Sequence, residues 1–268
     1  MNSVPKRLTP AAIAAMKGVA KIAALTAYDY QTARLLDAAG IPLILVGDSL
    51  GTTLLGYDNT LPVTLVDMLR HTAAVVRGVT RAVVVVDMPF MTYQVSVEQA
   101  LRNCGRAIQS TGCQAVKIEG GEFRAPTIAA LVQNGVPVLG HVGLTPQSVK
   151  VLGHRVQGRG DEAARQLVAD ARAVADAGAF AVVLEAVPAA LGAQVSAAVP
   201  IPVIGIGAGP GCDGQILVIN DVLGLSGDFH PKFVKVYADL GKQISAAAAA
   251  YQADVAGGAF PGPEHCYE

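Results

Sequence analysis

The chain has 268 residues, with 20 Lys or Arg against 21 Asp or Glu, so its formal net charge is −1. Charged residues make up only 15% of the sequence, whereas hydrophobic residues make up 52%. This composition excludes a disordered chain, which combines low hydrophobicity with high net charge. It also argues against a nucleic-acid-binding protein, because there is no basic excess to neutralise phosphates.

The cysteines and the longest apolar stretch favour a reduced, cytoplasmic protein that does not enter a membrane. The four cysteines, at positions 104, 113, 212 and 266, form no CxxC pair. Neither a zinc site nor a disulfide framework is therefore indicated. The uncharged stretch 186–212 is long enough to span a bilayer, but four prolines and five glycines interrupt it.

The first predicted elements are a short N-terminal helix and eight strands. Thr9 suits the N-cap of the helix, Pro10 its first position and Gly18 the residue after its end. The strands are short apolar runs rich in β-branched residues, and the absence of alternation indicates burial on both faces. They occupy residues 22–29, 42–48, 82–87, 115–119, 136–141, 181–185, 201–207 and 216–221.

Helical patterns separate most of these strands. Ser96, followed three residues later by Gln99, has the pattern of a capping box at the start of one helix. The alternation predicts an α/β protein with a parallel sheet, most simply a (β/α)8 TIM barrel; an open doubly wound sheet is the alternative. The predicted helices occupy 31–39, 65–77, 97–111, 127–134, 161–177 and 189–198.

Two further helices, at 231–240 and 244–255, are expected to close the barrel. No stretch resembles an interdomain linker, so we expect residues 1–268 to form a single domain. The scarcity of charged residues also favours a subunit that buries surface against copies of itself.

Most of the predicted strands end in a carboxylate. In a (β/α)8 barrel these ends form the catalytic rim, and converging carboxylates repel one another unless a cation neutralises them. Oxygen ligands suit Mg2+, with Mn2+ as the alternative. A simpler explanation, that each acid caps a helix or begins a turn, fits Asp29 and Asp221 better than Asp48 and Asp87. The acids are Asp29, Asp48, Asp87, Glu119, Glu185 and Asp221, and a further strand ends in His141.

Lys117 and Glu119 are two residues apart on one predicted strand, so their side chains point the same way. Burying such a pair inside a barrel costs free energy of folding unless a ligand or metal ion binds it, so the pair indicates a binding site. The alternative is an ion pair with a purely structural role.

Residues 209–214 (GPGCDG) satisfy the GxGxxG pattern. The dinucleotide fingerprint follows the first strand of a βαβ unit, whereas this motif follows the seventh strand. We therefore expect either a phosphate-binding loop or a tight backbone turn.

A series of short motifs lies in order along nearly the whole chain. They are TAYD at 26–29, VGDSLG at 46–51, TLPVT at 60–64, DMPFM at 87–91, VKIEGG at 116–121, GHVGLTPQ at 140–147, VQGRGDE at 156–162, LE at 184–185, and IGIGAG with DGQ at 204–215. In this series the chain resembles the ketopantoate (3-methyl-2-oxobutanoate) hydroxymethyltransferase family. The resemblance implies a barrel of the phosphoenolpyruvate mutase/isocitrate lyase type, cytoplasmic localisation and a homo-oligomer, a decamer by family analogy.

The resemblance also implies a reaction and its cofactors. The one-carbon unit of 5,10-methylenetetrahydrofolate would join C3 of 3-methyl-2-oxobutanoate, giving 2-dehydropantoate on the route to pantothenate and coenzyme A. Asp48 and Asp87 would bind one Mg2+ ion, with Glu119 as a third ligand directly or through water. Glu185 would be the catalytic base. The keto acid would contact Asp48, Ser49, Asp87, Lys117 and His141.

Two departures from the family pattern bear on the loops around the site. Residues 152–154 read Leu-Gly-His instead of Gly-Gly-Tyr, and Ala186 stands where some members have Cys. Neither is a proposed ligand or base. The alternatives to the family's reaction are a metal-dependent aldolase or lyase acting on another 2-keto acid, and a catalytically silent keto-acid-binding barrel.

Overall fold

The computed structural model describes residues 7–153, 155–227 and 231–268. The chain divides into two compact units, one up to Val218 and one from Ile219 onward. The expectation of one domain over 1–268 stays a prediction. His154, part of the first departure noted above, lies outside the described residues.

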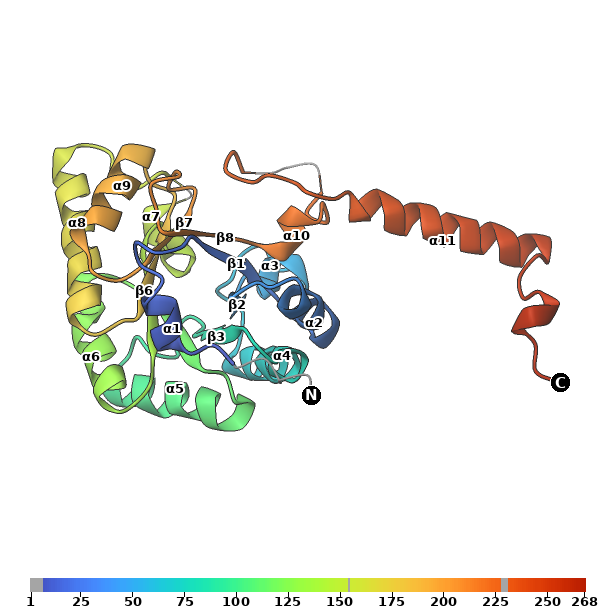
Figure 1. The fold of residues 1–268 in the computed structure, drawn as a ribbon, viewed down its shortest axis with the longest axis horizontal. Coiled ribbons are helices and arrows are strands. Elements are labelled where there is room, and N and C mark those ends of the chain that lie inside the picture. Colours follow the sequence, from blue (N-terminus) through green and yellow to red (C-terminus); the bar gives the residue numbers. More distant parts are fainter. Residues whose placement is uncertain (1–6, 154, 228–230) are drawn as a thin grey trace. The chain divides into compact units, whose positions relative to one another are not determined.

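The first unit is a closed barrel of eight parallel strands in chain order, which confirms the predicted (β/α)8 architecture (Figure 1). β2, β3 and β4 are buried along their whole length, as expected of apolar runs covered on both faces. The strands are β1 (Ile22–Thr26), β2 (Leu43–Val46), β3 (Val83–Asp87), β4 (Ala115–Glu119), β5 (Val138–Gly143), β6 (Ala181–Glu185), β7 (Val203–Ile206) and β8 (Gly214–Leu217).

The helices of the barrel lie within two residues of the predicted bounds. Ser96 caps α5 by accepting from Gln99 N at 3.1 Å, but the Gln99 side chain accepts from Val95 N, so only half of the predicted capping box forms. The main helices are α2 (Tyr30–Ala38), α4 (Leu65–Gly78), α5 (Val97–Thr111), α6 (Ala125–Gln133), α8 (Asp161–Asp176) and α9 (Ala189–Ala198). Short turns are α3 (Leu50–Thr53), α7 (Val149–Leu152), η1 (Glu122–Arg124) and η2 (Pro146–Ser148).

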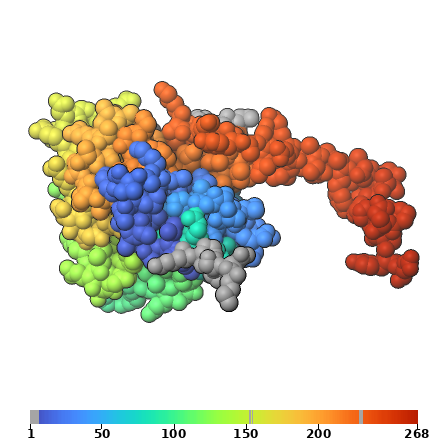
Figure 2. Space-filling model, in the orientation of Figure 1, coloured from blue at the N-terminus to red at the C-terminus, as the bar shows by residue number. Residues whose placement is uncertain are grey.

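The N-terminal helix α1 (Pro10–Ala14) contributes to the barrel core. Thr9 caps it as predicted, accepting from Ala12 N at 3.2 Å, but the helix ends well before Gly18. Ile13 is fully buried among inward-facing residues of the strands, including Leu43. In Figure 1 the helix α1 is drawn over the strands of the barrel, and Figure 2 shows the same face of the molecule with the segment around α1 in blue.

The connection from β7 to β8 departs from the predicted alternation. β8 begins at Gly214 instead of residue 216, and a glycine-rich loop without a helix precedes it. A Cβ on Gly209 would lie 2.5 Å from Cβ of Ala189, and one on Gly192 would lie 2.0 Å from the carbonyl oxygen of Ala208. The glycines of the GxGxxG-like motif thus let the loop lie against α9, in agreement with the tight-turn interpretation.

The second unit contains α10 (Ile219–Val222), α11 (Leu240–Gly257) and η3 (Pro263–His265). α11 confirms the helix predicted at 244–255. The prediction of a helix at 231–240 is wrong, because residues 231–239 contain one turn and no helix or strand. Phe233, Val234, Val236 and Tyr237 all have low helix propensity, which outweighs the apolar pattern. Among the helices of the described residues, none is long and apolar enough to cross a membrane.

Candidate active site

Six charged side chains gather where neighbouring strands end. Asp87, Glu119 and Glu185 are the last residues of β3, β4 and β6, Lys117 lies on β4, His141 on β5, and Asp48 follows β2. Strand pairing sets Asp87 opposite Lys117 and Glu119 opposite His141. All but Glu185 are at most 5% exposed. We call these residues the rim cluster: Asp48, Asp87, Lys117, Glu119, His141 and Glu185.

One half of the rim cluster joins two aspartates and a lysine. Lys117 Nζ donates to both carboxylate oxygens of Asp87, at 2.7 and 2.8 Å, and Asp48 N donates to Oδ2 of Asp87 at 3.3 Å. Burial, together with the charge of Asp87, raises the pKa of Asp48 well above its ordinary value. Burial also raises the pKa of Asp87, against the opposing effect of Lys117. One lysine does not fully compensate the two buried acids, so a further cation is favoured here.

The other half joins two glutamates through a histidine. His141 Nδ1 lies 3.4 Å from Oε1 of Glu119, and its Nε2 lies 3.2 Å from Oε2 of Glu185. Burial and Lys117 lower the pKa of His141, but the two glutamates outweigh them and raise it to about 9. Burial raises the pKa of Glu119, but the neighbouring His141 and Lys117 outweigh it, so this pKa is lowered. The two glutamates therefore favour the charged form of His141, which lies between them at ion-pair distance, although neither ring nitrogen makes a hydrogen bond within the described residues.

Gln147, which sequence reasoning did not select, connects the two halves. Its buried side chain donates from Nε2 to Oδ2 of Asp48 at 2.9 Å and to the carbonyl oxygen of Met88 at 2.8 Å. Its backbone N–H donates to Oε2 of Glu119 at 3.1 Å. The hydroxyl of Tyr93 donates to Oε1 of Gln147 at 2.8 Å and accepts from Glu119 N at 3.0 Å. The only sequence signal for Gln147 was its place in the motif at 140–147.

Ser49, a predicted keto-acid contact, is held by a chain of hydroxyl groups. The hydroxyl of Thr26 donates to that of Tyr28 at 2.9 Å, and the Tyr28 hydroxyl lies 2.8 Å from Oγ of Ser49. A Cβ on Gly47 would lie 2.7 Å from the same Oγ, so glycine makes room for this orientation. Tyr28 is buried, and it was not selected from sequence.

The rim cluster fits a cation bound by few protein ligands. Within the described part of the chain, no three His, Cys, Asp or Glu side chains are arranged to hold a metal ion together. Mg2+, however, is commonly bound through one or two carboxylates, with water and substrate completing its shell. Asp48 and Asp87 offer two buried carboxylates, and Oε1 of Glu119 is buried with no hydrogen-bond partner among the described residues. The donor set therefore suits Mg2+ better than a metal that needs several protein ligands.

Two of the predicted strand-end acids do not join the rim cluster. β1 ends at Thr26, and Asp29 is the N-cap of α2, accepting from Thr32 N at 2.8 Å. Asp221 lies in α10 and not at the end of β8. Capping, the simpler explanation given above, therefore accounts for Asp29, whereas Asp221 lies within the first turn of α10.

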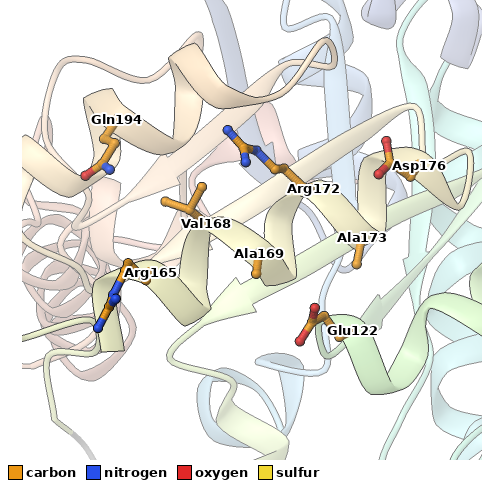
Figure 3. Close-up of a pocket in the computed structure, with 8 residues that line it drawn as sticks. All are labelled: Glu122, Arg165, Val168, Ala169, Arg172, Ala173, Asp176 and Gln194. Atoms are coloured by element: carbon orange, nitrogen blue, oxygen red, sulfur yellow. The ribbon is translucent and has the colours of Figure 1, made fainter. Parts of the chain in front are cut away.

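A hollow of about 550 Å3 on the outside of the barrel contains no member of the rim cluster. Figure 3 shows its lining: Arg165, Arg172 and Asp176 lie on α8, Gln194 on α9 and Glu122 on η1. The acids and the buried lysine needed for chemistry lie elsewhere, at the strand ends.

Comparison with known proteins assigns this chain to a family. The family model of ketopantoate hydroxymethyltransferase matches residues 7–263. The chain belongs to the ketopantoate hydroxymethyltransferase family. Curated 3-methyl-2-oxobutanoate hydroxymethyltransferases are similar to it: that of Dehalococcoides mccartyi is 59% identical, covering 90% of this chain and 86% of the relative. That of Paracoccus denitrificans is 54% identical, covering 100% and 98%.

Solved structures of other proteins share the fold of this hydroxymethyltransferase family member. A 2,3-dimethylmalate lyase, described as a member of the PEP mutase/isocitrate lyase superfamily, aligns with a TM-score of 0.60 at 18% identity, covering 96% of this chain and 93% of that one. A putative phosphonomutase from Burkholderia cenocepacia aligns with a TM-score of 0.63 at 20% identity, covering 91% and 98%. The expected barrel fold is therefore confirmed.

Proposed function

We propose that this chain transfers the one-carbon unit of 5,10-methylenetetrahydrofolate to C3 of 3-methyl-2-oxobutanoate, with Mg2+ bound at Asp48 and Asp87. The products are 2-dehydropantoate, on the route to pantothenate, and tetrahydrofolate. The observation that carries the proposal is the continuous rim cluster from Asp48 to Glu185 in a member of this family.

The residues of the first half of the cluster bind and orient the keto acid. Lys117 places a buried positive charge beside Asp87, where it favours the carboxylate and the developing enolate of the substrate. Ser49, held by Tyr28, offers a hydroxyl for the same substrate. Asp48 and Asp87 hold the cation, with Glu119 as a ligand directly or through water. Bound Mg2+ would supply a Lewis acid at the 2-keto acid.

Glu185 is the base in the proposed reaction. Its side chain is 16% exposed, more than those of Glu119 and His141, so a substrate can approach it. The C3 proton moves to Glu185 as the enolate forms. C3 then forms a bond to the one-carbon unit as the bond from that carbon to one folate nitrogen breaks, and this nitrogen takes up a proton equivalent to the one that left C3. Water supplies the new hydroxyl group as the bond from the same carbon to the second folate nitrogen breaks, and the proton released by water goes to that nitrogen.

His141 holds the base in place. Its Nε2 lies 3.2 Å from Glu185 Oε2, and the neighbouring glutamates raise the pKa of His141, which favours a charged ring beside Glu185. Among the described residues Glu185 pairs with His141 and forms no ion pair with Asp48 or Asp87, which supports division of the acids into cation ligands and base.

Turnover by purified protein tests the proposal. With Mg2+, 3-methyl-2-oxobutanoate and methylenetetrahydrofolate, the protein should form ketopantoate, and Glu185→Gln should lower kcat by about 10²–10⁴-fold. Glu162→Gln, at an exposed position in the first turn of α8, is the matched control. Full activity in Glu185→Gln would exclude Glu185 as the base. Turnover of other 2-keto acids without folate would instead support the aldolase or lyase alternative.

The assembly and localisation remain proposals by analogy. We propose a homodecamer, because the family resemblance implies it and charged residues are scarce, and a location in the cytoplasm, because the cysteines indicate neither a disulfide framework nor a zinc site. The molar mass of the native protein in solution tests the assembly, and a monomer would contradict it.

A further inference from the structure

A groove of about 560 Å3 opens beside the rim cluster, over the ends of β4 and β5. Gln147 belongs to both: its side chain bonds Asp48 and also lines the groove. Gly143, on the groove lining, would bring a Cβ within 2.3 Å of the carbonyl oxygen of Glu185. The groove therefore reaches the strand end that carries the proposed base.

The groove has an apolar, partly aromatic wall. Phe123 is 71% exposed and Phe90 is 38% exposed, although both belong to the barrel and line this one groove with the buried Leu167. Gly120 adopts φ 124°, and a Cβ there would lie 2.7 Å from the ring of Phe123. Glycine thus lets the ring lie over the end of β4. Exposed aromatic rings beside a buried polar site are suited to stacking against a flat ligand.

Negatively and positively charged side chains also line the groove, next to its apolar wall. Asp170 on α8 accepts at Oδ1 from Glu122 N at 2.9 Å and from Nε2 of Gln166 at 3.4 Å. Its carboxylate is thereby held at the groove, where it can accept from the N–H groups on the edge of a heterocycle. Lys150 supplies a cation on the loop side of the groove, which suits a carboxylate of the ligand.

We propose that this groove binds the folate co-substrate, a planar heterocycle joined through an aromatic ring to a carboxylate-bearing tail. The proposal rests on the function proposed above and extends it by placing the second substrate. The flat rings lie against Phe123 and Phe90, the heterocycle edge meets Asp170, and the tail carboxylates meet Lys150. The one-carbon unit then faces the keto acid from the side of β4 and β5.

Two single variants separate the groove from the keto-acid site. Phe123→Ala and Lys150→Ala change side chains at the groove while leaving the rim cluster intact. Each should weaken binding of tetrahydrofolate, measured by calorimetry, by about tenfold, the equivalent of 1.4 kcal/mol. Each should raise the KM for methylenetetrahydrofolate without changing that for the keto acid. Tyr267→Ala and Lys242→Ala, at exposed positions of the second unit, are the matched controls.

A folate-free reaction distinguishes the two proposals. In D2O with Mg2+, the parent protein should exchange the C3 proton of 3-methyl-2-oxobutanoate, and both groove variants should exchange it at the parent rate. Tetrahydrofolate affinity equal to that of the parent in both variants would overturn the groove assignment, as would loss of C3 exchange together with folate binding. Absence of exchange and of ketopantoate formation in the parent would contradict the proposed function itself.

Discussion

The side-chain amide of Gln147 donates a hydrogen bond of 2.9 Å to Oδ2 of Asp48, 99 residues earlier in the chain. The backbone N–H of Gln147 donates to Oε2 of Glu119 at 3.1 Å. One residue of the loop after β5 therefore sets the positions of two proposed ligands that come from different strands. Side chains that orient metal ligands without binding the metal themselves are important for the site. Their removal commonly lowers metal affinity or activity by about 10–100-fold.

Substitution of Gln147 should therefore disturb cation binding more than folding. Gln147→Glu keeps the shape but places an acceptor against Asp48 and the carbonyl of Met88, so we expect Mg2+ affinity and kcat each to fall by about 10–100-fold. Calorimetric titration with Mg2+ and steady-state kinetics measure the two effects. Gln133→Ala, at the exposed last residue of α6, is the control. Mg2+ affinity within twofold of the parent would contradict this positioning role.

Cation binding at Asp48 should release protons. Burial and the charge of Asp87 raise the pKa of Asp48 well above its ordinary value, so a bound cation displaces a proton from the cluster. Mg2+ affinity should consequently fall as the pH is lowered through this raised pKa. Titrations at one pH in two buffers of different ionisation enthalpy count the released protons. Asp48→Asn should remove the effect, whereas an unchanged count in that variant would assign the proton elsewhere.

The sequence predicts those residues of the site that lie at the ends of strands, because the position of a strand end can be recognised in the sequence. Asp87 and Glu185 each follow a continuous apolar run, so the position of the carboxylate follows from the strand itself. Asp29 was ambiguous because an Asp two to three residues past a strand is equally suited to capping a helix. The predicted position of the last strand, β8, was too far along the chain because apolar residues continue past Leu217 into α10.

The residues that sequence reasoning missed act through distant partners. Gln147 and Tyr28 are neutral, and no local pattern marks an amide or phenol that will bond to a carboxylate or hydroxyl on another strand. Their roles depend on the closed barrel, which brings β1, β2 and the loop after β5 to one rim. The helix expected at 231–240 failed for a different reason, since its β-branched and aromatic residues disfavour helix.

Removal of Lys117 should destabilise the barrel in a pH-dependent way. Lys117→Met leaves the buried Asp87 without its cation, and loss of one partner of such a pair costs about 3–5 kcal/mol. The pKa of Asp87, already raised by burial, then lies further above its value in the unfolded chain. A raised carboxylate pKa means that stability is present at low pH and is lost as the pH increases. Urea unfolding from pH 5 to 8 should show this decline.

The double variant Lys117→Met/Asp87→Asn tests that cause. It removes the acid together with its partner, so the decline of stability with increasing pH should be smaller than in Lys117→Met alone. An equal decline in both variants would show that Asp87 is not the responsible group.

The negative charge of Asp37 should stabilise the loop that precedes β3. Its carboxylate accepts from Thr80 N and from Ala82 N at 2.8 and 2.7 Å, and from the hydroxyl of Thr80 at 2.8 Å. Burial raises the pKa of Asp37, but these hydrogen bonds outweigh it and lower the pKa below 3.8. Asp37→Asn places an amide N–H2 against backbone donors, so it should cost about 1.5–3 kcal/mol at pH 7.

This cost should disappear in acid. A lowered carboxylate pKa gives stability that is present above the unfolded-state value, near 3.8, and is lost as the pH falls through the folded-state value. Urea unfolding of the parent and of Asp37→Asn should therefore differ at pH 7 and begin to converge only below about pH 4, as the pH falls through the folded-state pKa of Asp37. Asp58→Asn, at an exposed position, controls for loss of one negative charge. A difference that persists undiminished in acid would show that shape, and not the charge of Asp37, holds the loop before β3.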